Sequence, residues 1–78
     1  MNILYFASLK ESIGLSNEVI EAATDMTVND LRVLLIKRHG KQYFPSNILC
    51  AINHEIAKDS SKLNDDDEVA FYPPVTGG

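Results

Sequence analysis

Several residue types that mark specialised classes of protein are scarce in this sequence. Cys50 is the only cysteine in 78 residues, so no disulfide can form within the chain. This is typical of a reducing compartment, and we expect a cytoplasmic protein. No apolar run is long enough to span a membrane, and Ile3–Ala7 is too short for a signal-peptide core. Seven basic residues against eleven acidic ones argue against a nucleic-acid partner.

The usual motifs of catalysis and metal binding are also absent. No glycine-rich phosphate loop is present, so we expect no ATP binding by the chain itself, and no Ser-His-Asp or Cys-His arrangement stands out. His39 and His54 are interpreted as a helix-end cation and a turn residue. Asp65–Asp67 lacks the spacing of a calcium loop, so no metal site is expected. Cys50 lies in an apolar run and is interpreted as a core residue, with a sulfur-relay role as the alternative.

The order of apolar runs and turn residues predicts an α+β domain. Helix signals are clearest in one stretch, where Thr27 can cap, Asp30 suits the helix dipole, and Gly40 ends the helix after three basic or histidine residues. Ser8 is the expected cap of a shorter helix that ends near Ile13. The predicted strands are 3–7, 17–22, 48–52, 55–57 and 68–72, with a tight turn at 53–54.

A single long helix can cover only one face of such a sheet. Alternation places Ile3 and Tyr5 on one face of the first strand, and Leu4 and Phe6 on the other. In the last strand, Val69 and Phe71 share a face, and Tyr72 points the opposite way. We therefore expect exposed aromatic side chains near the end of the sheet, which would form a docking patch.

The printed sequence ends in Pro73-Pro74-Val75-Thr76-Gly77-Gly78. Two glycines without Cβ atoms give a thin backbone that could enter a narrow active site and present an unhindered α-carboxylate. A frayed end without a function is the alternative. The proline pair fixes φ and favours an extended path, so six residues could reach roughly 20 Å from the fold.

The run from Asp67 to Gly78 resembles the C-terminal signature of the small, sulfur-carrier subunit of molybdopterin synthase. Ile3–Ala7 and the helix from Thr27 to His39 are also similar to that family, so the resemblance extends over the whole chain. One position departs from the pattern: Asp66 stands where the family usually has glycine in the turn before the last strand. We expect this substitution to cost some local stability through left-handed backbone.

The resemblance implies a β-grasp, ubiquitin-like fold in residues 1–72, with about five strands and one long helix, followed by an extended flexible tail in 73–78. It implies that an E1-like adenylating enzyme uses ATP to activate the Gly78 carboxylate, and that a sulfur donor converts it to a thiocarboxylate. The large synthase subunit would then use this sulfur to form the molybdopterin dithiolene from precursor Z.

In this scheme the chain is an enzyme only as a subunit, in an assembly of two small and two large subunits, and it binds no cofactor. The residues that would enter partner active sites are those of the tail: Pro73, Pro74, Val75, Thr76 and Gly77. Position-for-position similarity implies a contact with the large subunit through Phe6, Ile56 and Tyr72.

Three other interpretations remain open at this stage. A carrier for thiazole synthesis in the thiamin pathway would share the fold and the terminal glycines. A ubiquitin-like modifier would be joined through Gly78 to lysines of target proteins. A plain interaction domain would have an inert tail.

Overall fold

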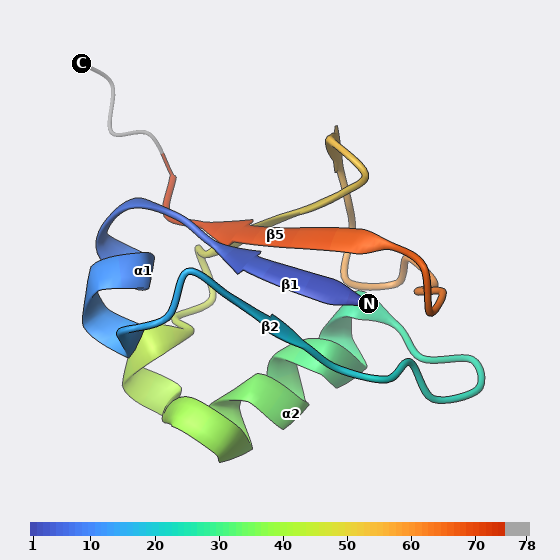
Figure 1. Ribbon diagram of the computed structural model, residues 1–78, viewed down its shortest axis with the longest axis horizontal. Coiled ribbons are helices and arrows are strands. Elements are labelled where there is room, and N and C mark those ends of the chain that lie inside the picture. The colour runs from blue at the N-terminus through green and yellow to red at the C-terminus, as the bar shows by residue number, and fades with distance from the viewer. Residues whose placement is uncertain (75–78) are drawn as a thin grey trace.

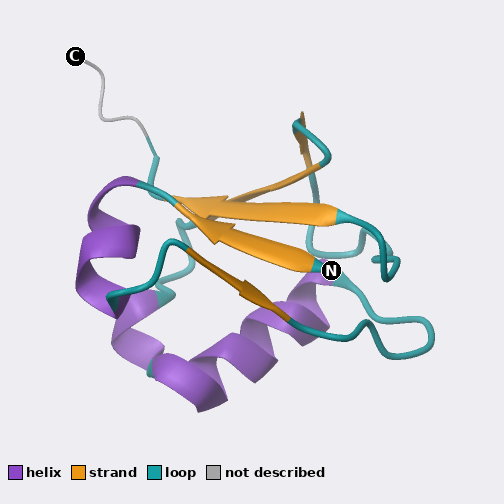
Figure 2. Cartoon of the chain, in the orientation of Figure 1, coloured by secondary structure: helices purple, strands orange, loops and turns teal. Residues whose placement is uncertain are grey.

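The computed structural model describes residues 1–74 of the chain. These residues form one mixed sheet with both of their α-helices on the same side (Figures 1 and 2). The elements in chain order are β1 (Asn2–Tyr5), α1 (Ala7–Ile13), β2 (Asn17–Val19), α2 (Val28–His39), the 3-10 helix η1 (Lys41–Tyr43), β3 (Leu49–Ile52), β4 (Glu55–Ile56) and β5 (Glu68–Tyr72). The sheet order is β2-β1-β5-β3-β4. The predicted α+β class and sheet of about five strands are confirmed.

The central pair of strands, β1 and β5, runs parallel, with Tyr5 beside Phe71. The other pairings are antiparallel, and β2 and β4 are the edges. The middle position of the sheet is held by β5, and β3 is an interior strand between β5 and the β4 edge. The first and last strands therefore join directly in the middle of the fold.

The core lies between the sheet and α2. The expected alternation is confirmed, because Ile3, Tyr5, Val69 and Phe71 are all essentially inaccessible to solvent. Buried residues of α2 pack against them, namely Val28, Leu31 and Leu35. Each such aliphatic side chain contributes about 1.5–3 kcal/mol when it is fully buried, so this layer is the main source of stability.

Local signals set the ends of α2 as predicted. The Thr27 hydroxyl accepts a hydrogen bond from the Asp30 amide (3.2 Å), and the Asp30 carboxylate accepts one from the Thr27 amide (3.0 Å). This reciprocal capping box satisfies two amides that the helix leaves free. At the other end, the Gly40 amide donates to the carbonyl of Ile36, and Gly40 has a φ of 131°. Glycine suits that conformation because it has no Cβ.

The predicted cap of α1 at Ser8 is wrong. The strand ends at Tyr5, Phe6 occupies the N-cap position in extended backbone without a side-chain cap, and the helix begins at Ala7. The Phe6 amide donates to the carbonyl of Phe71, which holds Phe6 against the sheet (3.2 Å). The chain then turns abruptly, with a φ of 54° at Ala7, so Ser8 is already inside the helix.

Two turn predictions have different outcomes. The turn at Asn53-His54 is confirmed, and both residues have positive φ (50° and 73°), as hairpin turns of the primed type require. The predicted left-handed backbone at Asp66 is wrong, because Asp66 is not among the non-glycine residues with positive φ. The carboxylate of Asp67 accepts from the Asn64 amide and the Asn53 side chain, and these bonds stabilise the turn without a glycine.

Candidate functional site

The end of the sheet from which the tail departs brings together four of the predicted site residues, namely Phe6, Tyr72, Pro73 and Pro74. Since β1 and β5 are parallel, their C-terminal ends lie at the same end of the sheet, on the side where α1 lies (Figure 1). Phe6 follows the last residue of β1, and Pro73 follows Tyr72 of β5. An apolar surface and the root of the tail are thus placed side by side by the strand topology.

The face of the sheet opposite the helices is apolar and open. Strand register places Leu4, Ala70, Ala51 and Ile56 in one row across four strands, and Tyr72 and Leu49 in the next. Phe6 continues this second row on the β1 side, because its backbone is extended. Phe6 is 48% and Ile56 is 80% exposed. We call these seven residues the sheet patch: Leu4, Phe6, Leu49, Ala51, Ile56, Ala70 and Tyr72.

The sheet patch is wider than the three residues named from the sequence. Phe6 and Tyr72 are neighbours, but Ile56 lies on the far edge strand, and Ala51 and Ala70 fill the space between. Alternation along β3 would have identified Leu49 and Ala51, since Cys50 between them is buried. Small side chains in the middle and larger ones around them leave space for side chains of a partner.

The structure describes only the first part of the tail. Pro73 and Pro74 are half-buried and line a notch of about 240 Å³ between α1 and the segment around η1, together with Leu9 and Tyr43. Val75, Thr76, Gly77 and Gly78, which are predicted to enter and react in partner active sites, lie outside the described residues.

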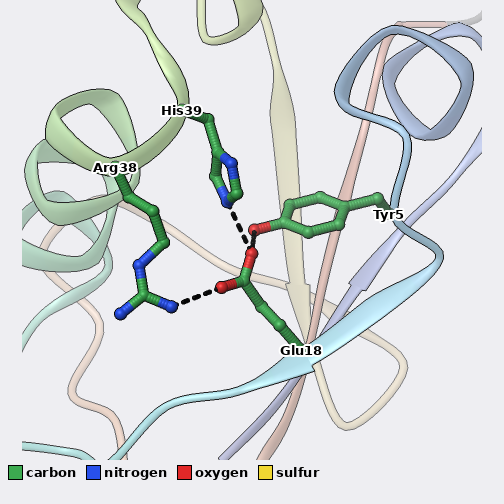
Figure 3. A network of polar contacts seen from close by, with 4 residues as sticks. All are labelled: Tyr5, Glu18, Arg38 and His39. Atoms are coloured by element: carbon green, nitrogen blue, oxygen red, sulfur yellow. Dashed lines mark hydrogen bonds and ion pairs between the residues drawn. The ribbon is translucent and has the colours of Figure 1, made fainter.

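A polar network on the helix side was not predicted from the sequence (Figure 3). The carboxylate of Glu18 on β2 accepts a hydrogen bond from the Tyr5 hydroxyl (2.7 Å) and contacts Nε2 of His39 (2.6 Å) with the same oxygen. Its other oxygen pairs with the Arg38 guanidinium (2.6 Å). The network joins β1, β2 and the end of α2, beside the core.

Burial and hydrogen bonding act in opposite directions on Glu18. Burial alone raises the pKa of this carboxyl group, but the hydrogen bonds from Tyr5, His39 and Arg38 together outweigh it, so the pKa lies below its ordinary value of 4.5. Burial, followed by the hydrogen bond to Glu18, raises the pKa of the Tyr5 hydroxyl. Both shifts favour an ionised Glu18 and a neutral Tyr5 that donates to it.

The other candidate groups have structural surroundings. Cys50 is buried in the core, and burial raises the pKa of its thiol to about 11, which argues against a reactive sulfur. His39 takes part in the network with Glu18, and His54 lies in the β3–β4 turn, 3.6 Å from the Glu68 carboxylate.

Within residues 1–74, no group of three or more His, Cys, Asp or Glu side chains is arranged to hold a metal ion. No helix described here has the length and apolar character needed to cross a membrane.

The mixed sheet crossed by one long helix, with an open apolar face beside a C-terminal tail, defines a β-grasp domain of the ubiquitin-like class. The ThiS family model matches residues 3–78, and the chain belongs to that family. It is 34% identical to the molybdopterin synthase sulfur carrier subunit of Escherichia coli, over 100% of this chain and 99% of that protein. The corresponding subunit of Chlamydomonas reinhardtii is 31% identical, with 100% and 98% covered.

Among solved structures, SAMP1 of Haloferax volcanii, a small archaeal modifier protein, superimposes with a TM-score of 0.82 at 27% identity. The alignment covers 100% of this chain and 98% of that one. The predicted fold and family are therefore confirmed, and the chain is a sulfur carrier of the kind that forms the small subunit of molybdopterin synthase.

Proposed function

We propose that the reacting group of this sulfur carrier is the carboxylate of Gly78 and that the folded domain presents and docks it. An adenylating enzyme joins the carboxylate to AMP from ATP and releases pyrophosphate, because a carboxylate by itself is a poor electrophile. A sulfur donor then displaces AMP and leaves a thiocarboxylate. The large synthase subunit takes up this sulfur to build the dithiolene of molybdopterin from precursor Z.

The observation that best supports this proposal is the juxtaposition of the sheet patch and the root of the tail. Phe6, Tyr72 and Leu49 lie at the end of the sheet from which Pro73 departs. A partner that covers this patch therefore lies beside the root of the tail. Full-length similarity to sulfur carrier subunits supports the same assignment of roles.

Docking through the sheet patch is also reasonable in energetic terms. Monomeric proteins rarely leave large contiguous apolar surfaces exposed without a binding role. Burying one exposed aliphatic side chain such as Ile56 provides about 1.5–3 kcal/mol, or roughly ten- to a hundred-fold in affinity. Ordering a proline-restricted tail costs less entropy than ordering a flexible one.

Mass spectrometry of the protein isolated from its own cells tests the chemistry. The expected result is a population with one oxygen replaced by sulfur, located in the C-terminal peptide. A variant that lacks Gly78 should keep the fold and lose this modification. Sulfur acceptance by the truncated protein would contradict the proposal.

Calorimetric titration with the large subunit tests the docking surface. Ile56→Asp should weaken association at least about tenfold, because it removes an apolar contact and buries a charge. Val33→Asp is the matched control: Val33 is 46% exposed on α2, which lies on the opposite side of the sheet from the sheet patch. Equal affinities for the two variants would exclude the sheet patch as the interface.

A second candidate function is protein modification through Gly78, and the likeness to SAMP1 favours it. The same mass spectra distinguish the two functions, since a modifier gives isopeptide-linked Gly78 on lysines of other proteins. A thiazole carrier would give the same thiocarboxylate. Formation of molybdopterin from precursor Z by thiocarboxylated protein and large subunit separates these pathways.

A further inference from the structure

Charge is distributed unevenly along the chain. Residues 31–54 contain four basic residues and no acidic one, whereas the whole chain has a net charge of −4. The four basic residues lie on α2 and η1, and they are Arg32, Lys37, Arg38 and Lys41. Together α2 and η1 carry these four basic residues and one acidic residue, Asp30, so they are more basic than the chain as a whole.

An apolar groove of about 680 Å³ lies within this basic region. Its lining includes Val33 and Ile36 of α2, and Phe44 and Pro45 after η1. Val33 is 46% exposed, although it lies in the middle of the longest helix. Part of its lining belongs to α2, which lies on one side of the sheet (Figure 1), whereas strand register places the sheet patch on the opposite face. We call this apolar groove the helix-side groove.

Two cations at the helix-side groove differ in their surroundings. The Arg32 side chain pairs with Asp59 (3.0 Å) and lies over the Phe71 ring, 5.5 Å from its centre, so it is fixed and largely neutralised. Lys41 also lines the groove, and no carboxylate among residues 1–74 is within ion-pair distance of it. The same holds for Lys37, one turn of α2 beyond Val33. Asp59 also lines the groove but is paired with Arg32, so the groove combines a largely apolar lining with the unpaired positive charge of Lys41.

We propose that the helix-side groove docks an acidic segment of a partner protein that carries one or two large apolar side chains. The apolar side chains fill the space beside Val33, Ile36 and Phe44, as in helix-in-groove recognition. The carboxylates face Lys41 and Lys37, which fixes orientation and speeds association. A nucleic acid fits less well, because two unpaired lysines neutralise few phosphates and the apolar lining offers phosphates no partner.

The position of the groove relates it to the tail. Gln42 and Pro45 line both the helix-side groove and the notch formed with Pro73 and Pro74. A partner in the groove therefore lies beside the root of the tail and leaves the sheet patch free. Two proteins could therefore act on the tail at the same time, one from each side of the sheet. This simultaneous action rests on the proposed function, whereas binding of the acidic segment to the helix-side groove does not.

Titration of the ¹⁵N-labelled full chain, followed by NMR, tests the binding. The probe is a synthetic amphipathic peptide with leucine and phenylalanine on one face and aspartate and glutamate on the other. The expected result is shifts at Val33, Ile36 and Lys41 that weaken as salt is added. Lys41→Glu and Val33→Gln should each reduce the affinity for the peptide at least about fivefold. Glutamate and glutamine are well tolerated in helices and at surfaces, so both variants should stay folded. Lys10→Glu, the same charge change at an exposed position of α1, should leave binding unchanged.

Three results would overturn the proposal. Shifts confined to the sheet patch would assign the peptide to the other surface. Equal binding by Lys41→Glu and Lys10→Glu would show that the groove charge has no specific role. Shifts at Val33 and Ile36 that depend on protein concentration without peptide would identify a second copy of the chain as the occupant. None of these readouts requires activation of Gly78, so their failure is distinct from failure of the carrier chemistry.

Discussion

Replacing Glu18 with alanine should destabilise the fold more than any exposed substitution does. The variant loses the acceptor of the Tyr5 hydroxyl and the carboxylate that pairs with His39 and Arg38. Tyr5 is 1% exposed, so water cannot easily replace the lost acceptor. An orphaned buried donor costs about 1–3 kcal/mol.

The contacts of Glu18 with His39 and Arg38 add to this loss unequally. His39 is nearly as buried as Glu18, and a charge-assisted hydrogen bond in such surroundings contributes about 1.5–3 kcal/mol. Arg38 is half exposed, and its pair contributes at most about 1 kcal/mol. Glu18→Ala should therefore lower the free energy of unfolding by about 3–5 kcal/mol, a large share of the stability of a small domain.

Urea unfolding of a double-mutant cycle measures this network. Tyr5→Phe alone should cost about 1 kcal/mol, because it removes one hydrogen bond and leaves the contacts of Glu18 with His39 and Arg38 in place. In the Glu18→Ala background, Tyr5→Phe should be neutral or stabilising, since it removes the orphaned hydroxyl, and a coupling of about 1–2 kcal/mol follows. The reasoning is refuted if Glu18→Ala costs under about 1 kcal/mol, or if Tyr5→Phe costs the same in both backgrounds.

Three further predictions concern single groups. The pKa of Glu18 is below 4.5 in the folded state, so the ionised carboxylate stabilises the fold fully above pH 4.5, and this stabilisation is lost as pH falls through the lowered pKa. Between pH 7 and pH 3, the free energy of unfolding in urea should therefore decrease less for Glu18→Gln than for the wild type. His54→Gly should raise the free energy of unfolding by about 0.5–1 kcal/mol, because His54 has a φ of 73° in a primed turn; a lower urea midpoint would contradict this. The buried Cys50 thiol should react with iodoacetamide at pH 8 far more slowly in the native than in the urea-unfolded protein, and equal rates would show that it is accessible.

Elements with local signals could be predicted from the sequence. Thr27, Asp30 and Gly40 act within one turn of α2, so their roles do not depend on the rest of the fold. Alternation in β1 and β5 predicted the buried face for a similar reason, because the period of a strand is intrinsic to its backbone.

Features that depend on distant partners could not be predicted. Glu18 and His39 are 21 residues apart, and neither residue type alone indicates that they pair. Ser8 is a reasonable cap in isolation, but the bond from Phe6 to Phe71 fixes where the strand ends. At Asp66 the family pattern suggested a strained turn, whereas the side chains of Asp67 and Asn53 determine the local backbone.

The parallel pairing of β1 with β5 has a consequence for biosynthesis. The middle of the sheet consists of the first and last strands, so the core cannot close until Glu68–Tyr72 has been synthesised. Such distant pairing delays folding until the loop between the strands has closed. A ribosomal product that stops before β5 would expose Ile3 and Tyr5 and would be an early target for proteolysis. Because of this topology, only chains that have been translated at least as far as the root of the tail can fold.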